Sequence, residues 1–206
     1  MTTDEDTNFA GGEVWRKAIH LLVLVCPAVL FYLGRDVSLV VLAGFSLVAI
    51  GCDVWRARSA AFNGLIDRFF GFMMRKSEQT EPGGRVVING ATWILVSLLI
   101  LVSIFPFKLA LVSFSIFVVA DAAAAAIGMT IGKRTWPNSD STYAGSAAFF
   151  IVGVSILIPV FNYDPVVATL GAAAGTVVEA VFPWPNDNVS APLSIAVFLW
   201  TASQYL

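Results

Sequence analysis

The sequence has 206 residues, of which 58% are hydrophobic and 13% are charged, and its mean hydropathy is +0.81. Soluble domains carry about 25% charged residues, so this composition excludes an ordinary water-soluble protein and predicts an integral membrane protein. The formal net charge is −2 and no stretch is strongly basic, which excludes a nucleic-acid-binding protein.

Residues 1–13 contain four acidic residues and are expected to form a flexible tail. The rest of the chain is dominated by apolar runs, and a membrane-spanning helix needs about 17–20 apolar residues. Spans are expected near 18–34, 37–54, 86–105, 107–131, 144–161, 166–182 and 190–206.

The stretch 59–78 interleaves aromatic and charged residues at helical spacing, which predicts an amphipathic helix lying in the membrane interface. No internal repeat or long hydrophilic linker divides the chain. We therefore expect a single all-α membrane domain over residues 1–206, a polytopic helical bundle of about seven transmembrane helices plus one interfacial helix.

The basic residues predict how this bundle is oriented. With seven spans, ten of the twelve lysine and arginine residues fall on the side of the N-terminus. Positive residues gather on the cytoplasmic side of membrane proteins, so the N-terminus and the even-numbered connections are expected to be cytoplasmic. The acidic N-terminus and the compact chain favour a prokaryotic cytoplasmic membrane.

Asp121 lies within the fourth expected span, where an ionisable residue costs about 2.5–3.5 kcal/mol. At 1.5 Å per residue, it lies roughly 15 Å below the helix end at Gly132. The small residues 122–126 and Gly128 follow it. One interpretation is a packing surface in which Asp121 bonds a neighbouring helix; the other is a functional carboxylate that a ligand can approach.

Lys133 and Arg134 come directly after this helix. They are either a positive anchor at the cytoplasmic boundary or cations that hold a polyphosphate while Asp121 holds Mg²⁺. Near the N-terminus, Arg16, Lys17 and His20 fall on one helix face. His20 alone would be an ordinary interfacial histidine.

The last cytoplasmic connection contains Asn186, Asp187 and Asn188. These residues either form a turn that caps the final helix or contribute to a site. Glu179 lies in the preceding span, so two carboxylates would meet at the cytoplasmic rim. Oxygen-rich pairs of this kind suit Mg²⁺ bridged to substrate phosphates.

Taken in order, these motifs resemble those of CTP-dependent lipid kinases, the family of dolichol kinase, phytol kinase and CTP-dependent diacylglycerol kinase, within a superfamily that includes phosphatidate cytidylyltransferase. The resemblance spans nearly the whole chain. The matching residues are Glu13-x-x-Arg16-Lys17-x-x-His20, Asp53-x-x-Arg56, Asn89-Gly90-Ala91-Thr92-Trp93, Asp121-x6-Gly128-x3-Gly132-Lys133, Gly145-Ser146, Glu179 and Asp187-Asn188-x3-Pro192-Leu193.

The resemblance implies transfer of the terminal phosphoryl group of CTP to the hydroxyl of a membrane lipid alcohol, with Mg²⁺ as cofactor. Asp121 and Asp187 would be catalytic, and together with Glu179 they would be the metal ligands. Contacts to the nucleotide and its phosphates would come from Arg16, Lys17, His20, Lys133, Arg134 and Asn188. Supporting positions would be Asp53, Arg56, Gly128, Gly132, Gly145 and Ser146.

The sequence departs from this family in two places. Ala120 precedes the helical aspartate, where relatives usually have glycine. In the following loop, Ser141 and Ala144 stand where relatives often have a lysine and a glutamate. Loss of one cation from a phosphate site costs several kcal/mol of transition-state stabilisation, so the departure bears on activity more than on fold.

Three other functions are alternatives to the kinase. A cytidylyltransferase would use the same nucleotide but release pyrophosphate. A transporter would use Asp121 as an intramembrane ion site, yet it needs polar residues in both halves of the membrane, and the outer half has few. A structural scaffold would not need acidic and basic residues to gather on one side. Helix faces rich in glycine and alanine would permit a homodimer.

Overall fold

The computed structural model describes residues 19–74, 78–137, 139–182 and 184–205. Within these ranges the regular structure is helical, and the only β-type pairing is an isolated bridge between Thr135 and Thr142. A helical turn at 19–22 leads into the first helix. The helices are α2 (Val25–Leu33), α3 (Arg35–Arg58), α4 (Ala60–Phe70), the 3-10 helix η1 (Gly71–Met73), α5 (Gly90–Ile104), α6 (Phe107–Ile131), α7 (Tyr143–Leu157), α8 (Pro165–Val181) and α9 (Asp187–Ala202).

The all-α prediction is confirmed, and each expected span coincides with one helix. In the described ranges only α3 and α6 are both long and apolar enough to cross a membrane. The helices α5, α7 and α8 are apolar but only 15 to 17 residues long. The number of membrane spans therefore stays a prediction. The amphipathic stretch 59–78 contains α4 and η1.

Short polar side chains fix where several helices begin. The Asn89 side chain accepts a hydrogen bond from the Thr92 amide at the start of α5. Thr142 accepts one from the Gly145 amide at the start of α7. These are ordinary N-cap contacts, which satisfy amides that have no partner inside the helix. They explain why apolar runs of similar composition begin at defined residues.

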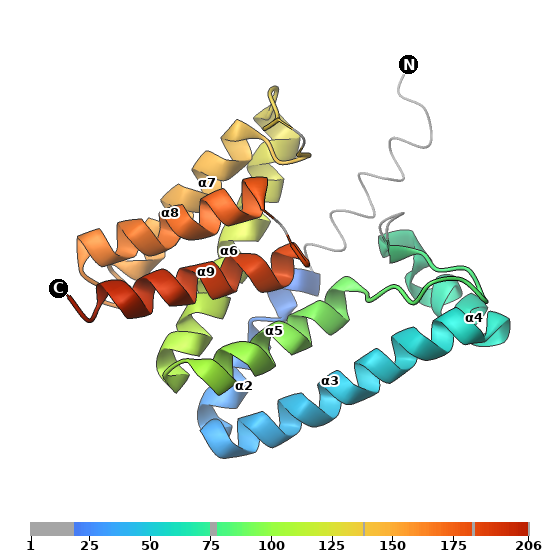
Figure 1. The fold of residues 1–206 in the computed structure, drawn as a ribbon. Coiled ribbons are helices and arrows are strands. Elements are labelled where there is room, and N and C mark those ends of the chain that lie inside the picture. Colours follow the sequence, from blue (N-terminus) through green and yellow to red (C-terminus); the bar gives the residue numbers. More distant parts are fainter. Residues whose placement is uncertain (1–18, 75–77, 138, 183, 206) are drawn as a thin grey trace.

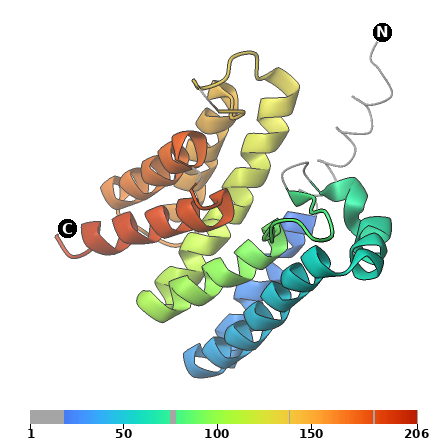
Figure 2. The same cartoon turned by 45° about the vertical axis from the view of Figure 1, so that its right-hand side comes forward.

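The helix α6 runs through the middle of the bundle, packing against α7 and α9, while α8 pairs with α9 and α3 pairs with α5 (Figure 1). A second view shows that α3 and α4 form one flank and α7 and α8 the other (Figure 2). Between them lies a core of fully buried side chains. Its largest members include Phe114, Phe117, Phe149, Leu98 and Leu199.

Glycines let α6 and α7 approach closely. A Cβ atom on Gly145 would lie 2.8 Å from the Ala124 carbonyl oxygen, and one on Gly132 would lie 2.6 Å from the Thr142 hydroxyl. A Cβ on Gly128 would be 3.0 Å from the same hydroxyl. The small residues after Asp121 therefore serve helix packing at this crossing, as the first of the two interpretations predicts.

Candidate active site

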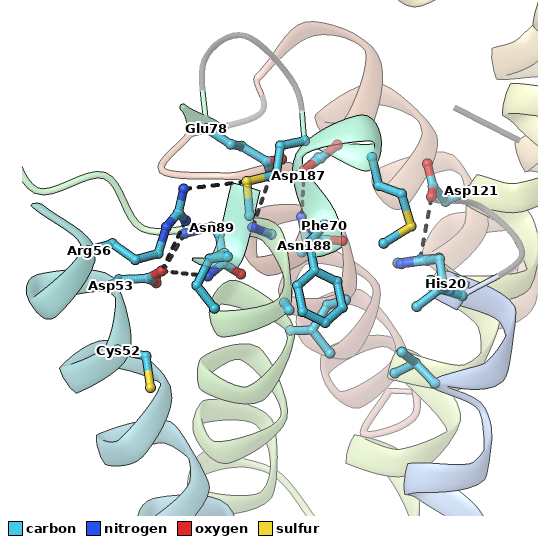
Figure 3. A pocket seen from close by; sticks show the side chains of 18 residues that line it. His20, Cys52, Asp53, Arg56, Phe70, Glu78, Asn89, Asp121, Asp187 and Asn188 are labelled. Carbon is cyan, nitrogen blue, oxygen red and sulfur yellow. Dashed lines mark hydrogen bonds and ion pairs between the residues drawn. The ribbon is translucent and has the colours of Figure 1, made fainter. Parts of the chain in front are cut away.

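A cavity of about 370 Å³ lies where α5 and α9 begin, bounded also by the segment before α2 and by α3, α4, η1 and α6 (Figure 3). Part of the cavity wall is apolar and part is polar. Apolar side chains come from the segment before α2 and from α4 and η1, among them Ile19, Ile66, Phe70 and Met73. The polar side chains are His20, Asp53, Arg56, Glu78, Asn89, Asp121, Asp187 and Asn188.

The different lengths of the helices produce this cavity. Asp121 is in the second half of α6, and about 15 Å of helix continues beyond it. By contrast, α5 begins at Gly90 and α9 at Asp187, and both residues line the same cavity as Asp121. The carboxylate therefore faces the space at the ends of two shorter helices rather than a packed interior.

In this cavity His20 Nε2 lies 3.4 Å from Asp121 Oδ2, so the two side chains form an ion pair when the imidazole is protonated. Both side chains are about nine-tenths buried. The edge of the His20 ring packs against Phe117, with the ring centroids 5.6 Å apart. This packing holds the imidazole against the carboxylate, an arrangement suited to moving a proton.

At the start of α9, polar side chains cap the helix, and two of the same residues line the cavity. The Asn186 side chain accepts hydrogen bonds from the Asn188 amide, at 3.0 Å, and from the Asn188 side chain, at 2.9 Å. Asn188 is buried, and it lines the cavity together with Asp187. The structure thus brings together Asp121 and Asp187, the two carboxylates expected to be catalytic.

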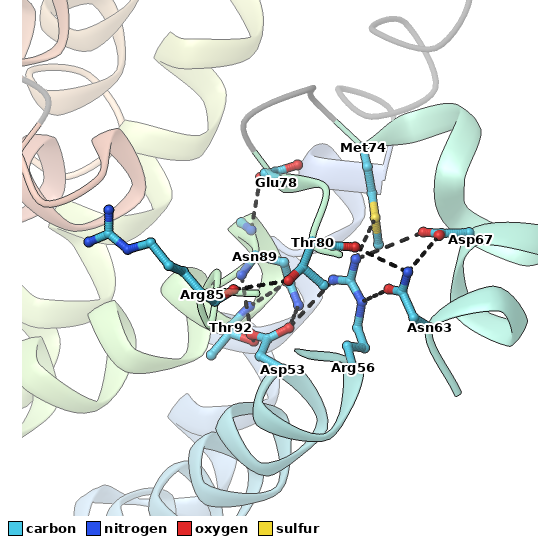
Figure 4. A network of polar contacts seen from close by, with 11 residues as sticks. Asp53, Arg56, Asn63, Asp67, Met74, Glu78, Thr80, Arg85, Asn89 and Thr92 are labelled. Atoms are coloured by element: carbon cyan, nitrogen blue, oxygen red, sulfur yellow. Dashed lines mark hydrogen bonds and ion pairs between the residues drawn. The ribbon is translucent and has the colours of Figure 1, made fainter. Parts of the chain in front are cut away.

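A second polar centre surrounds Asp53, which is fully buried (Figure 4). Its carboxylate accepts hydrogen bonds from the Asn89 amide at 3.2 Å, from the Asn89 side chain, and from the Thr92 hydroxyl at 2.7 Å. These contacts tie the end of α3 to the start of α5. Asp53 therefore joins two helices that border the cavity, and its supporting role in the site stays a prediction.

Arg56 lies one turn further along α3 and is 2% exposed. Its Nε donates to the Asn63 side chain at 3.3 Å, and its Nη2 lies 3.4 Å from the Met74 sulfur. Two carboxylates lie at longer distances, Asp53 at 3.7 Å from Nη1 and Asp67 at 3.9 Å from Nη2. The positive charge is thus balanced inside the fold while the side chain lines the cavity.

Glu78 is a site residue that the sequence patterns do not indicate. Its Oε1 accepts a hydrogen bond from the Gly90 amide at 3.0 Å, at the start of α5. A Cβ on Gly90 would lie 2.9 Å from this oxygen, so the glycine makes room for the contact. Glu78 is the last residue of the stretch 59–78 predicted to be an amphipathic helix, and that pattern does not indicate a contact with the start of α5.

Other predicted residues lie outside the cavity lining. The Glu179 carboxylate accepts a hydrogen bond from Ser141 at 3.1 Å, and Ser146 accepts one from the Trp136 indole at 2.9 Å. Lys133 and Arg134 are exposed. Arg16 and Lys17 lie outside the described residues, so their predicted phosphate contacts stay predictions, as do those of Lys133 and Arg134.

The side chains that could ligate a metal can be compared with the expected Mg²⁺ site. In the part of the chain that the structure describes, no three His, Cys, Asp or Glu side chains are grouped closely enough to hold a metal. Mg²⁺ usually takes one or two carboxylates and completes its shell with water and substrate phosphates. Asp121 and Asp187 both line the cavity, as such a role requires, whereas Glu179 bonds Ser141 outside the cavity lining.

Sequence comparisons show which named enzymes the chain is similar to. The chain is 29% identical over 219 residues to a protein of Eremothecium gossypii, with 92% of this chain and 67% of the relative covered. It is 30% identical over 151 residues to a protein of Schizosaccharomyces pombe, with 69% of this chain and 64% of the relative covered. Both relatives are named CTP-dependent diacylglycerol kinase 1.

The similarity supports a relationship to CTP-dependent lipid kinases. An uncharacterized protein of Rickettsia prowazekii is 26% identical over 197 residues, with 92% of this chain and 93% of that protein covered. No family model matches the sequence, and no solved structure matches it.

Proposed function

We propose that the chain is a CTP-dependent lipid kinase that transfers the terminal phosphoryl group of CTP to the hydroxyl of a membrane lipid alcohol at the cytoplasmic face. The observation that carries the proposal is the cavity itself. It joins an apolar wall to a polar wall that holds Asp121, His20 and Asp187. Such a surface suits an amphiphile whose hydroxyl is the reacting group. Among lipid alcohols, diacylglycerol is the first to test because the named relatives are diacylglycerol kinases.

The outer surface of α3 supports a bilayer setting. Large apolar side chains are exposed along it, and Val40 and Leu47 are 74% and 71% exposed. Soluble monomers rarely expose contiguous apolar surface of this kind. The lipid acceptor would reach the cavity from the bilayer, past the apolar side chains of α4 and η1, while CTP would come from the side where the basic residues gather.

The proposed reaction follows from the contacts in the cavity. The lipid hydroxyl gives its proton to the pair formed by His20 and Asp121, its oxygen bonds to the terminal phosphorus of CTP, and the bond to the bridging oxygen breaks to release CDP. An imidazolium formed at His20 is stabilised by the Asp121 carboxylate 3.4 Å away. Asp121 and Asp187 would hold Mg²⁺, which would supply charge neutralisation for the phosphoryl transfer. Arg16, Lys17, Lys133 and Arg134 are proposed to add positive charge.

The test uses purified protein in detergent with Mg²⁺ and CTP labelled at either the α or the γ phosphate. Diacylglycerol, phytol, a polyprenol and phosphatidic acid are offered separately, and the lipid fraction is counted. We expect the γ label to enter an alcohol and the α label to enter none. Transfer of the α label to phosphatidic acid would instead identify a cytidylyltransferase. Absence of both labels from every lipid would refute the proposal.

A further inference from the structure

One hydrogen-bond donor of the Arg56 guanidinium lacks an acceptor in the part of the chain that the structure describes. Its Nη1 is buried and has no hydrogen-bond partner among the described residues. The nearest carboxylate oxygen, on Asp53, is 3.7 Å away, which is an ion-pair distance but too long for a hydrogen bond. A buried donor without an acceptor is costly, and native proteins rarely leave one in that state. Because Arg56 lines the cavity, a ligand in the cavity can supply the missing acceptor.

The charges around Arg56 indicate what kind of oxygen atom in a ligand would accept this hydrogen bond. Asp53 and Asp67 both lie within 4 Å of the guanidinium. A phosphate dianion bound there would be placed beside two carboxylates and repelled by them. A neutral carbonyl oxygen accepts the same hydrogen bond without that repulsion.

The surroundings of Arg56 point the same way. Asp53 and Asp67 already balance the charge of Arg56, and its Nη2 lies against the Met74 sulfur, so its remaining donor does not need an anionic partner. Figure 3 shows Arg56 apart from Asp121 and His20, with Asn188 and Phe70 between them. The oxygen recognised by Arg56 therefore belongs to a neutral group of the acceptor lipid that lies a short distance from the reacting hydroxyl. An acyl ester carbonyl of a glycerolipid is such a group.

We propose that Nη1 of Arg56 donates a hydrogen bond to an acyl ester carbonyl of the acceptor, so that the cavity selects acylglycerols over alcohols without a carbonyl group. This assignment rests on the proposed lipid kinase function. It gives the cavity a specificity element distinct from the proton-accepting pair.

The experiment compares two acceptors that differ only in the carbonyl groups, a 1,2-diacylglycerol and a 1,2-dialkylglycerol with chains of equal length. The wild-type protein is expected to favour the diester in kcat/KM by roughly 10- to 100-fold, the effect of one hydrogen bond to a charged group. In Arg56→Lys the ratio is expected to approach one, through a loss on the diester alone. Arg58→Lys, an exposed position on the same helix, is the matched control and is expected to keep the wild-type ratio.

The outcomes separate this assignment from the function on which it rests. A wild-type ratio near one overturns the assignment, and this measurement does not depend on the variant folding. An equal loss on both lipids in Arg56→Lys also overturns it, because a purely structural role would act on both substrates alike. Transfer of the γ label to neither lipid, nor to any other alcohol, overturns the proposed function as well.

Discussion

Replacement of Asp121 by asparagine tests the proposed proton transfer most directly. The change keeps the shape of a side chain that is 6% exposed and removes its charge. At 3.4 Å and an effective dielectric constant of about 20, the carboxylate stabilises an imidazolium at His20 by about 5 kcal/mol. Since each 1.36 kcal/mol is about tenfold in rate, turnover should fall by about 1,000-fold or more, within the usual range for general base catalysis.

The assay is transfer of γ-labelled phosphate from CTP to diacylglycerol in detergent micelles, with kcat and KM measured separately. The effect should be in kcat, because an uncharged asparagine still fills the same space. Asp36→Asn is the matched control, since Asp36 is exposed in the first turn of α3, away from the cavity, and its loss should leave kcat unchanged. A turnover of Asp121→Asn within tenfold of the wild type, with the protein folded, would refute the proposed role.

Three further variants probe the site and its frame. Asp187→Asn should lower kcat by about 100-fold across a series of Mg²⁺ concentrations, and an unchanged rate throughout would remove Asp187 from the site. Gly145→Ala should lower the free energy of unfolding by about 1–3 kcal/mol, because its Cβ would lie 2.8 Å from a backbone oxygen, and the loss should be seen as a lower melting temperature. Gly44→Ala is the control, since open space surrounds that position, and it should not lower the melting temperature. Asp53→Ala should destabilise the fold by about 3–5 kcal/mol, because it removes the nearer carboxylate of a buried arginine and the acceptor of three hydrogen bonds. Asp67→Ala, at a side chain that is 45% exposed, should cost under about 1 kcal/mol. Equal melting temperatures for the last two variants would contradict the weight given to the buried pair.

The helices could be predicted from the sequence because apolar runs and their polar N-caps are local signals. The range 107–131 predicted for the fourth span matches α6 as the structure has it. Much of the cavity lining was also predictable, since Asp121 is an ionisable residue within an apolar run, and His20, Asp187 and Asn188 are polar residues near the ends of such runs. The structure places all four in one cavity.

Local signals could not predict contacts between residues that lie far apart in the sequence. Nothing in the spacing pairs His20 with Asp121, because the two lie on helices that meet only after the bundle has assembled. Glu179 was predicted to approach Asp187 from nearness in the sequence, and the contact that the structure gives it, a hydrogen bond from Ser141, could not be predicted in this way. The resemblance implied a lysine at position 141, so a neutral hydroxyl contacts the carboxylate where a cation was expected.

In the proposed bilayer setting, the unequal helix lengths would have a consequence for the surrounding lipid. Helices of 15 to 17 residues, such as α5, α8 and α9, are only about 22–26 Å long, whereas the hydrocarbon layer is about 30 Å thick. Hydrophobic mismatch of this size is relieved by compression of the adjacent bilayer, at fractions of a kcal/mol per Å. Around α5 and α9 the headgroup plane would therefore sink toward the depth of Asp121. A lipid hydroxyl carried in that lowered plane would meet the carboxylate without being lifted out of its leaflet.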